Sequence, residues 1–268
     1  MRITSRLIGI VGATALVAAL AMPVAADNHE ARVRVVHASP DAPNVDVWVD
    51  GETVLTDVPF TAVSDYLTLP AGDYEIAVSA TGDTTPVIGP VTLTFEGGTS
   101  TTIAAFGLLA DIDAAVFADD TTIADGQSKL RAIHLSPSAP ASVDIAVQGG
   151  DVVVPGLAYP EASGYLTLDA GDYPLEIRAA GDTAAALQFD VTLEANTNYT
   201  AFAMDAEDGV QVIAAVDAQG TAAPETPTNP DTALPVPTSG MPLLLAGIAL
   251  IGVAIVASVR TLAPGRER

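Results

Sequence analysis

One stretch of this chain occurs twice, and the repeat constrains the fold more than any other feature. Residues 36–43 read VHASPDAP, and residues 133–140 read IHLSPSAP. The run AGDY at residues 71–74 recurs letter for letter at residues 170–173. Because the matches occur twice in the same order, the sequence predicts two homologous domains of about a hundred residues each.

Each copy has the pattern of short strands separated by turns. In residues 45–50 three valines fall on one face, and Asp46, Trp48 and Asp50 fall on the other. No stretch in the middle of the chain keeps a helical period for three turns. Turn signals recur about every 8–12 residues, which predicts an all-β fold of tandem Greek-key or immunoglobulin-like β-sandwiches. The expected domain bounds are residues 27–124 and 125–218.

A turn followed by a tyrosine occurs at the same place in both copies. Residues 69–74 and 168–173 follow the pattern L-x-x-G-x-Y. This pattern resembles the tyrosine corner of Greek-key sandwiches, in which the hydroxyl bonds back to the chain where it crosses between sheets. We expect Tyr74 and Tyr173 to make this bond.

The H-x-S-P-x-A-P signature, the duplication and the run Y-L-T-L…A-G-D-Y together resemble the DUF4397 family of bacterial and archaeal surface domains. The resemblance covers about residues 31–218, in two copies. It implies an extracytoplasmic β-sandwich module. It implies no activity, because the family has none assigned.

The signature segment also offers a Ser–His–acid interpretation, with His37, Ser39 and Asp41 as its members. The second copy has Ser138 in place of Asp41, and no G-x-S-x-G elbow is present. We therefore expect a structural role, in which each histidine donates to a backbone carbonyl of the following loop and the prolines preset its φ angles. The residues given this role are His37, Ser39, Pro40, Pro43, His134, Ser136, Pro137 and Pro140.

Charge restricts the partners of the chain. The formal net charge is −23, and residues 27–240 hold five Lys or Arg against 32 of the 33 acidic residues. Such a surface repels phosphate backbones, which excludes nucleic acid as a partner. It is typical of a highly soluble or salt-adapted protein, or of one that binds cations. The chain has no cysteine, which excludes disulfides and thiolate metal sites.

Acidic loops are the candidates for a cation site. Their oxygen ligands suit Ca²⁺, although the spacing departs from the EF-hand loop. The alternative is a set of solvated acidic turns, with no cofactor at all. The candidate ligands are Asp111, Asp113, Asp119 and Asp120 in the first copy and Asp205, Glu207 and Asp208 in the second.

Two expectations concern the outward face of the first copy. Arg34 and Asp46 are expected to project from adjacent strands and to form a cross-strand ion pair, as are their counterparts Arg131 and Asp144. If exposed, such a pair would contribute about 0–1 kcal/mol. Trp48, the only tryptophan, is expected to face outward, where it could contact a partner or a sugar. A single exposed aromatic residue is also ordinary, and the second copy has Ala146 at this position.

Both ends of the chain have the features of targeting segments. Residues 1–26 read as a secretory signal, with an uncleaved membrane anchor as the alternative. Residues 241–259 carry no charge, and a helix of this length would span roughly 28 Å, close to a bilayer core. The basic tail at residues 260–268 should then be cytoplasmic. Residues 219–240 are rich in Pro and Thr and should form an extended stalk.

The end of the stalk resembles a sortase sorting signal. Residues 234–240 read LPVPTSG, whereas the usual pentapeptide is L-P-x-T-G. Two extra residues are present, and a serine separates Thr238 from Gly240. Sortase processing at this site is therefore the alternative to a retained single-pass membrane anchor.

These observations predict a non-enzymatic, exported protein that displays two β-sandwiches on a membrane-anchored stalk. Its role would be structural or adhesive, with a cell-wall or extracellular polymer as the expected partner. One alternative is a Ca²⁺-stabilised module that binds a carbohydrate or another ligand. The least favoured alternative is a surface hydrolase.

Overall fold

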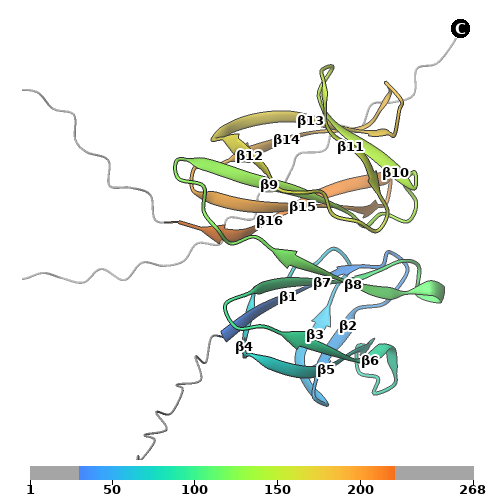
Figure 1. Cartoon of the computed structure of the whole chain (residues 1–268). Coiled ribbons are helices and arrows are strands. Elements are labelled where there is room, and N and C mark those ends of the chain that lie inside the picture. Colours follow the sequence, from blue (N-terminus) through green and yellow to red (C-terminus); the bar gives the residue numbers. More distant parts are fainter. Residues whose placement is uncertain (1–29, 221–268) are drawn as a thin grey trace, which may run out of the picture.

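The computed structural model describes residues 30–220 of the chain. Within this range the regular elements are strands, apart from one 3-10 turn, η1, at Leu109–Asp111. The strands form four sheets of four strands each, two in each repeat (Figure 1). The prediction of an all-β chain with two sandwich-like units is therefore confirmed.

The first domain consists of two stacked sheets. The sheet that faces the second domain, called the inner sheet, has the strand order β4-β1-β7-β8. The sheet on the far side, called the outer sheet, has the order β3-β2-β5-β6. The strands are β1 (Glu30–Ala38), β2 (Val45–Val49), β3 (Glu52–Val58), β4 (Leu67–Pro70), β5 (Gly72–Ala80), β6 (Pro86–Phe95), β7 (Ser100–Phe106) and β8 (Asp113–Asp119).

The second domain repeats this arrangement strand for strand. Its inner sheet has the order β12-β9-β15-β16, and its outer sheet has the order β11-β10-β13-β14. The strands are β9 (Gln127–His134), β10 (Ser142–Val147), β11 (Val152–Ala158), β12 (Leu166–Asp169), β13 (Gly171–Ala179), β14 (Ala185–Leu193), β15 (Thr197–Ala206) and β16 (Gly209–Gln219).

The inner sheets fix which residues of the two domains are equivalent. β1 runs parallel to β7 with His37 opposite Ala105, and β9 runs parallel to β15 with His134 opposite Ala203. The other strand pairs of the four sheets are antiparallel. Ala105 and Ala203 are therefore structural equivalents, and the residues that follow them can be compared directly.

Apolar side chains at alternate strand positions fill the space between the two sheets of each domain. In the first domain, Val33 and Ile103 of the inner sheet pack with Ile76 and Phe95 of the outer sheet. Both sheets of the second domain supply a larger cluster that includes Phe189. Full burial of one such side chain stabilises the fold by about 1.5–3 kcal/mol. Each domain therefore has a core of its own.

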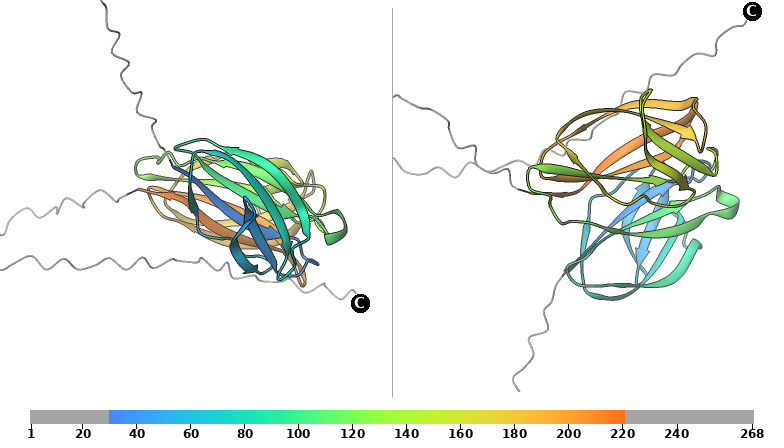
Figure 2. Two further views of the ribbon diagram at one scale, coloured as in Figure 1. Left: turned by 90° about the horizontal axis from the view of Figure 1, so that it is seen from below. Right: turned by 45° about the horizontal axis from the view of Figure 1, so that its top comes forward.

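A further apolar cluster lies between the domains. Val36 and Ala104 of the first inner sheet pack with Ile133, Phe202 and Met204 of the second, and all five side chains are 0% exposed. The four sheets thus form a stack of four layers, with the two inner sheets in the middle (Figures 1 and 2). Because the inner sheets are covered on both faces, nine of the ten positions of β15 are buried.

The tyrosine corners lie where the chain passes from the inner to the outer sheet. The Tyr74 hydroxyl donates to the carbonyl of Pro70 at 2.8 Å, between β5 and β4. The Tyr173 hydroxyl donates to the carbonyl of Asp169 at 2.8 Å, between β13 and β12. These are the bonds that the L-x-x-G-x-Y pattern predicts.

Several predictions concern residues outside the described range. They are the secretory signal at 1–26, the stalk at 219–240 beyond its first two residues, the sorting site at Thr238 and Gly240, the apolar span at 241–259 and the basic tail at 260–268. Between residues 30 and 220 no helix is both long enough and apolar enough to cross a membrane.

Candidate functional site

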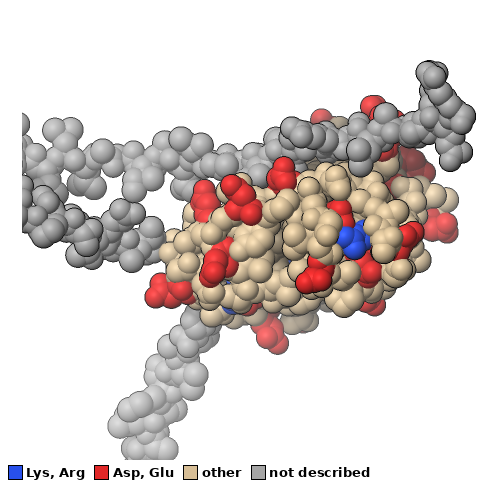
Figure 3. All heavy atoms as spheres, turned by 90° about the horizontal axis from the view of Figure 1, so that it is seen from above, with Lys and Arg blue, Asp and Glu red and all other residues tan. Residues whose placement is uncertain are grey.

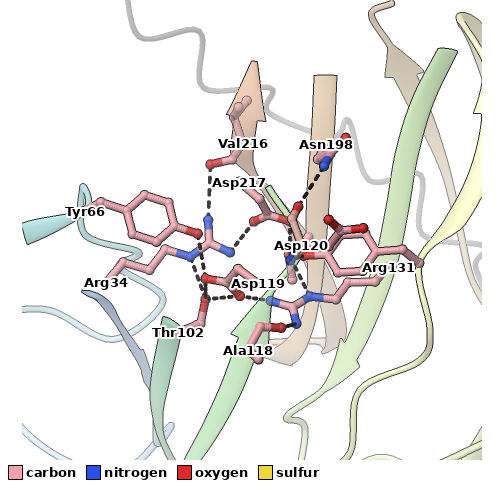
Figure 4. Close-up of polar contacts among 12 residues, drawn as sticks. Arg34, Tyr66, Thr102, Ala118, Asp119, Asp120, Arg131, Asn198, Val216 and Asp217 are labelled. Atoms are coloured by element: carbon pink, nitrogen blue, oxygen red, sulfur yellow. Dashed lines mark hydrogen bonds and ion pairs between the residues drawn. The ribbon is translucent and has the colours of Figure 1, made fainter. Parts of the chain in front are cut away.

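A buried arginine connects the first domain to the second. Arg34 lies on β1, and its side chain points away from the core of its own domain toward the second domain (Figure 4). Its Nε donates to Thr102 Oγ1 at 2.8 Å, and a second guanidinium nitrogen pairs with the Asp217 carboxylate. A third contact reaches the carbonyl of Val216 at 3.3 Å. The residue is only 1% exposed, so these contacts replace its hydration.

Arg131 makes the same contacts in the opposite direction. It lies on β9, and its Nε donates to Thr200 Oγ1 at 2.8 Å. Its guanidinium pairs with the Asp119 carboxylate of the first domain and donates to the carbonyl of Ala118 at 2.8 Å. The interface is therefore related to itself by an approximate twofold axis, as in an isologous dimer.

Two threonines join the ion pairs into one closed network. Thr102 Oγ1 accepts from Arg34 and donates to Asp119, at 2.8 Å to its Oδ2. Thr200 Oγ1 accepts from Arg131 and donates to Asp217 Oδ2 at 2.7 Å. We call this closed set of six residues the polar ring (Figure 4). Its members are Arg34, Thr102, Asp119, Arg131, Thr200 and Asp217.

Two tyrosines cover the polar ring. The Tyr66 hydroxyl donates to Asp119 at 2.6 Å, and the Tyr165 hydroxyl donates to Asp217 at 2.6 Å. Each phenol ring also stacks on an arginine, with 4.9 Å between ring centroid and guanidinium carbon for both Arg34 and Arg131. Burial raises the pKa of both tyrosine hydroxyls, so both stay neutral donors.

The charges of the polar ring balance, since it contains two guanidinium groups and two carboxylates. Burial raises the pKa of Asp217, while the Arg34 guanidinium and the hydroxyls of Tyr165 and Thr200 act in the opposite direction. Each hydroxyl in the ring donates to a carboxylate and is held by it. Groups arranged in this way fix the position of two domains, and they present no free nucleophile or base to a substrate.

The linker between the domains is also held. Asn198 of β15 donates to the carbonyls of Asp120 and Thr122, at 2.7 and 3.1 Å. Lys129 of β9 forms an ion pair of 2.6 Å with the Asp120 carboxylate. These bonds tie the chain that leaves β8 to the start of the second domain, so the linker adds to the polar ring in fixing the two domains.

The expected ion pair between Arg34 and Asp46 does not exist. Asp46 accepts the backbone N–H of Asp57 at 2.8 Å and that of Gly82 at 3.0 Å, and the latter contact contributes most to the lowering of its pKa. The prediction was wrong because β1 and β2 belong to different sheets, and because the outward face of β1 is covered by the other domain. Asp217 and the two threonines of the ring were not identified from the sequence. The signal that could have found them is their recurrence: Thr102 and Asp119 return as Thr200 and Asp217.

The histidines of the repeated signature fix the loop that follows them. His37 Nε2 lies 3.1 Å from the Pro43 carbonyl, and His134 Nε2 lies 3.0 Å from that of Pro140. A carbonyl only accepts, so Nε2 carries the proton, and Nδ1 accepts the backbone N–H two residues on at 3.4 Å in both domains. Burial lowers the pKa of both histidines. This is the loop-pinning role expected from the sequence.

The Ser–His–acid set is not assembled. Nδ1 of His37 accepts from the backbone of Ser39 and Nε2 donates to a carbonyl, so neither nitrogen is placed as a base for the Ser39 hydroxyl. The Asp41 carboxylate accepts the backbone N–H of Leu109 at 2.7 Å instead of orienting the histidine. His37 lies near the end of β1, Ser39 and Asp41 lie in the loop that follows, and these contacts hold that loop.

The two signature loops differ in one contact. Ser136 Oγ donates to the buried Asp205 carboxylate, which also accepts the Ser138 hydroxyl at 2.8 Å. By the register of the inner sheets, the first domain has Gly107 where the second has Asp205. Among the described residues the buried Ser39 Oγ has no hydrogen-bond partner. The first loop thus lacks a bond that the second has.

The acidic loop residues are not gathered into a cation site. In residues 30–220 no group of three or more His, Asp or Glu side chains is placed to hold a metal ion. Asp119 pairs with Arg131, Asp120 pairs with Lys129, and Asp205 accepts from serines. Asp111, Glu207 and Asp208 are exposed at turns, and Asp113 is exposed at the start of β8. The predicted ligand sets are therefore separated because the most buried carboxylates have partners within the protein.

Comparison with known proteins gives a family and distant structural similarities. A family model described as "Domain of unknown function (DUF4397)" matches residues 31–146 and 141–228. No curated protein matches the chain. Among solved structures, the Bacillus anthracis TIE protein is 11% identical with a TM-score of 0.23, and the match covers 66% of this chain and 34% of that one. The chain thus spans about a third of that protein.

A second solved structure has a similarly low sequence identity and TM-score. It is CBMbc (family CBM26) from Eubacterium rectale Amy13K in complex with maltoheptaose, which is 10% identical with a TM-score of 0.23. The match covers 68% of this chain and 95% of that one.

Proposed function

The chain belongs to the DUF4397 family, and we propose that it is a non-enzymatic cell-surface protein that displays its two domains as one rigid unit. The observation that carries this proposal is the polar ring, in which each domain supplies the carboxylate for the other domain's arginine. Removal of one partner from a buried ion pair is strongly unfavourable, so the domains resist separation. A stiff unit of this kind suits a structural or adhesive role. We include in the proposal the Greek-key, immunoglobulin-like description of each sandwich.

The surface of the unit supports a role outside the cell. Acidic side chains are spread over the face seen in Figure 3, with few basic ones among them. Three of the five basic residues in the described range, Arg34, Arg131 and Arg178, are buried in ion pairs. The exposed charge is therefore almost entirely negative, which keeps the unit soluble and repels acidic polymers. Together with the secretory signal, stalk and apolar span expected from the sequence, this favours display from a membrane anchor.

The absence of cysteine allows a direct test of this display. We would introduce one cysteine at a time, as Asp208→Cys on an exposed turn and Arg266→Cys in the basic tail, and treat intact cells with a membrane-impermeant maleimide. The proposal expects labelling of Asp208→Cys on intact cells. It expects labelling of Arg266→Cys only after permeabilisation.

The same two variants distinguish a retained membrane anchor from sortase cleavage and from a protein that is not displayed. Protection of Asp208→Cys on intact cells would overturn the proposal. If a sortase cleaves near Thr238, the mature protein would carry the Asp208→Cys label but would have lost the residue at 266 altogether. The mass of the labelled product distinguishes this from a retained anchor.

A further inference from the structure

The solvent-facing side of the first outer sheet bears a hollow of about 260 Å³. Trp48 of β2 and Glu75 of β5 line it, together with Thr84 from the β5–β6 turn. Pro86 and Pro90 of β6 also line the hollow. The hollow therefore combines one large aromatic surface, two rigid apolar rings, a carboxylate and a hydroxyl.

The indole of Trp48 is held in one orientation. Its Nε1 donates to Ser79 Oγ at 2.9 Å, and Ser79 Oγ donates to the carbonyl of Asp83 at 2.8 Å. The residue is half-buried, so part of the ring stays in contact with solvent. Because the side chain is already fixed, a ligand that stacks on it does not have to order it first.

A bulge in β6 shapes the opposite wall. The pairing of β5 with β6 shifts between Ile76 and Val78, at the place where Gly89 and Pro90 leave the ladder. Gly89 has a φ of +77°, and a Cβ there would lie 2.5 Å from the Ile76 carbonyl oxygen, so no other residue fits. Bulges of this kind re-aim side chains beside functional sites. Here the bulge brings Pro90 to the edge of the hollow.

The second domain has different side chains at the equivalent positions. Ala146 stands where the first domain has Trp48, as the pairing of β10 with β13 shows. On β13, Glu176 and Arg178 stand where β5 has Ala77 and Ser79, and they form a buried ion pair. The hollow is thus a departure from the repeated pattern, made by residues of the first domain alone.

We propose that the hollow binds a neutral oligosaccharide. A sugar ring has an apolar C–H face, which stacks on the Trp48 indole, and a rim of hydroxyls, which donate to Glu75 and bond to Thr84. The lining contains no Lys or Arg, and the net charge of the chain is −23, so phosphate and uronate ligands are disfavoured. The proposal rests on the proposed surface role and names the class of extracellular polymer that the unit would meet.

Trp48 also provides the readout, because it is the only tryptophan in the chain. Intrinsic emission of the purified full-length chain would be titrated with cellohexaose, chitohexaose and xylohexaose up to about 10 mM, a range that covers millimolar dissociation constants. We expect a saturable change in emission with at least one of them. We expect polygalacturonate to bind at least tenfold more weakly. No saturable change with any of the three neutral probes would overturn the proposal.

Two variants check the site itself. Glu75→Gln keeps the fluorophore and changes an exposed side chain, and it should weaken binding severalfold without altering thermal unfolding. Trp48→Ala, followed by calorimetry, should abolish binding, and circular dichroism would confirm its fold. Unchanged affinity in both variants would place any binding elsewhere and refute the hollow as the site. Because the titration is done on purified protein and the cysteine labelling on cells, failure of one does not imply failure of the other.

Discussion

Arg34 and Asp217 lie 183 positions apart in the chain and form a buried ion pair across the domain interface. The side chain of Arg34 is 1% exposed and that of Asp217 is 0% exposed. Arg131 and Asp119 form the equivalent pair in the opposite direction. The two domains are thus joined by charges that neither domain neutralises alone.

Loss of one charge should therefore be costly. We expect Arg34→Ala to lower the free energy of unfolding by about 3–5 kcal/mol, because Asp217 stays buried without its partner. The measurement is urea unfolding of the full chain. Arg32→Ala is the matched control, because Arg32 is exposed and only stacks on Tyr66, so its loss should cost about 1 kcal/mol or less. Equal costs for the two variants would contradict a buried pair.

The two signature serines should respond differently to the same substitution. Ser136→Ala removes a donor from the buried Asp205 carboxylate and should cost about 1–3 kcal/mol. Ser39→Ala removes a buried hydroxyl that has no partner among the described residues, so it should be neutral or stabilising. Both are measured by chemical unfolding. A larger cost for Ser39→Ala than for Ser136→Ala would show that the first loop holds a bond that this geometry lacks.

The tyrosine corners should contribute equally in the two domains. Tyr74→Phe and Tyr173→Phe each remove one hydrogen bond to a backbone carbonyl, and each should cost about 0.5–1.5 kcal/mol. The double variant should show the sum, because the corners lie in different domains and share no partner. Thermal unfolding of the three variants provides the test. If neither single variant changes the unfolding temperature, the two tyrosine hydroxyls do not contribute to stability.

Stability should fall as the pH falls below about 6.5, the ordinary pKa of histidine. Burial lowers the pKa of His37 and His134 from 6.5, so the folded chain binds fewer protons than the unfolded chain in this range. The stabilisation is fully present above pH 6.5 and is lost as the pH drops toward the lowered values. Most carboxylates titrate below about pH 5, and the raised pKa of the buried Asp217 acts in the opposite direction, so unfolding midpoints between pH 7.5 and 5 are compared with those of a variant that lacks both histidines.

The matching control is a His37→Gln/His134→Gln double variant. It should be less stable than the natural chain at pH 7.5, because the loops lose the histidine hydrogen bonds that hold them. Its unfolding midpoint should also change less between pH 7.5 and 5. An equally steep dependence would assign the pH effect to other groups.

Much of the fold could be predicted because its signals are local. Valine alternation at residues 45–50 marks a strand, and the L-x-x-G-x-Y pattern places Tyr74 at a crossing between sheets. The role of His37 could also be predicted, since its partner carbonyl is only six residues away. Such features depend on contacts within a few residues or on the period of a strand.

The polar ring could not be predicted in the same way. The alternation of side chains along β1 places Arg34 on the face opposite the domain core. In an isolated sandwich that face would be exposed to solvent. Only contact with the second domain buries this face. The carboxylates that pair with the arginines come from β8 and β16, far along the chain. The sequence therefore predicts Asp119 as a cation ligand, whereas in the structure its carboxylate pairs with the Arg131 guanidinium. Burial between domains is not encoded in the period of a single strand.

The approximate twofold symmetry of the polar ring has a consequence for how such a chain arises. Each domain carries both an arginine and the carboxylate that its counterpart needs, so each has the donor half and the acceptor half of the same interface. A gene for one domain of this kind would encode everything required to pair two identical subunits. Duplication and fusion would then make the pairing permanent and independent of concentration. Once fused, the copies could diverge on their outer sheets, as Trp48 and Ala146 have done, while the interface remained common to both.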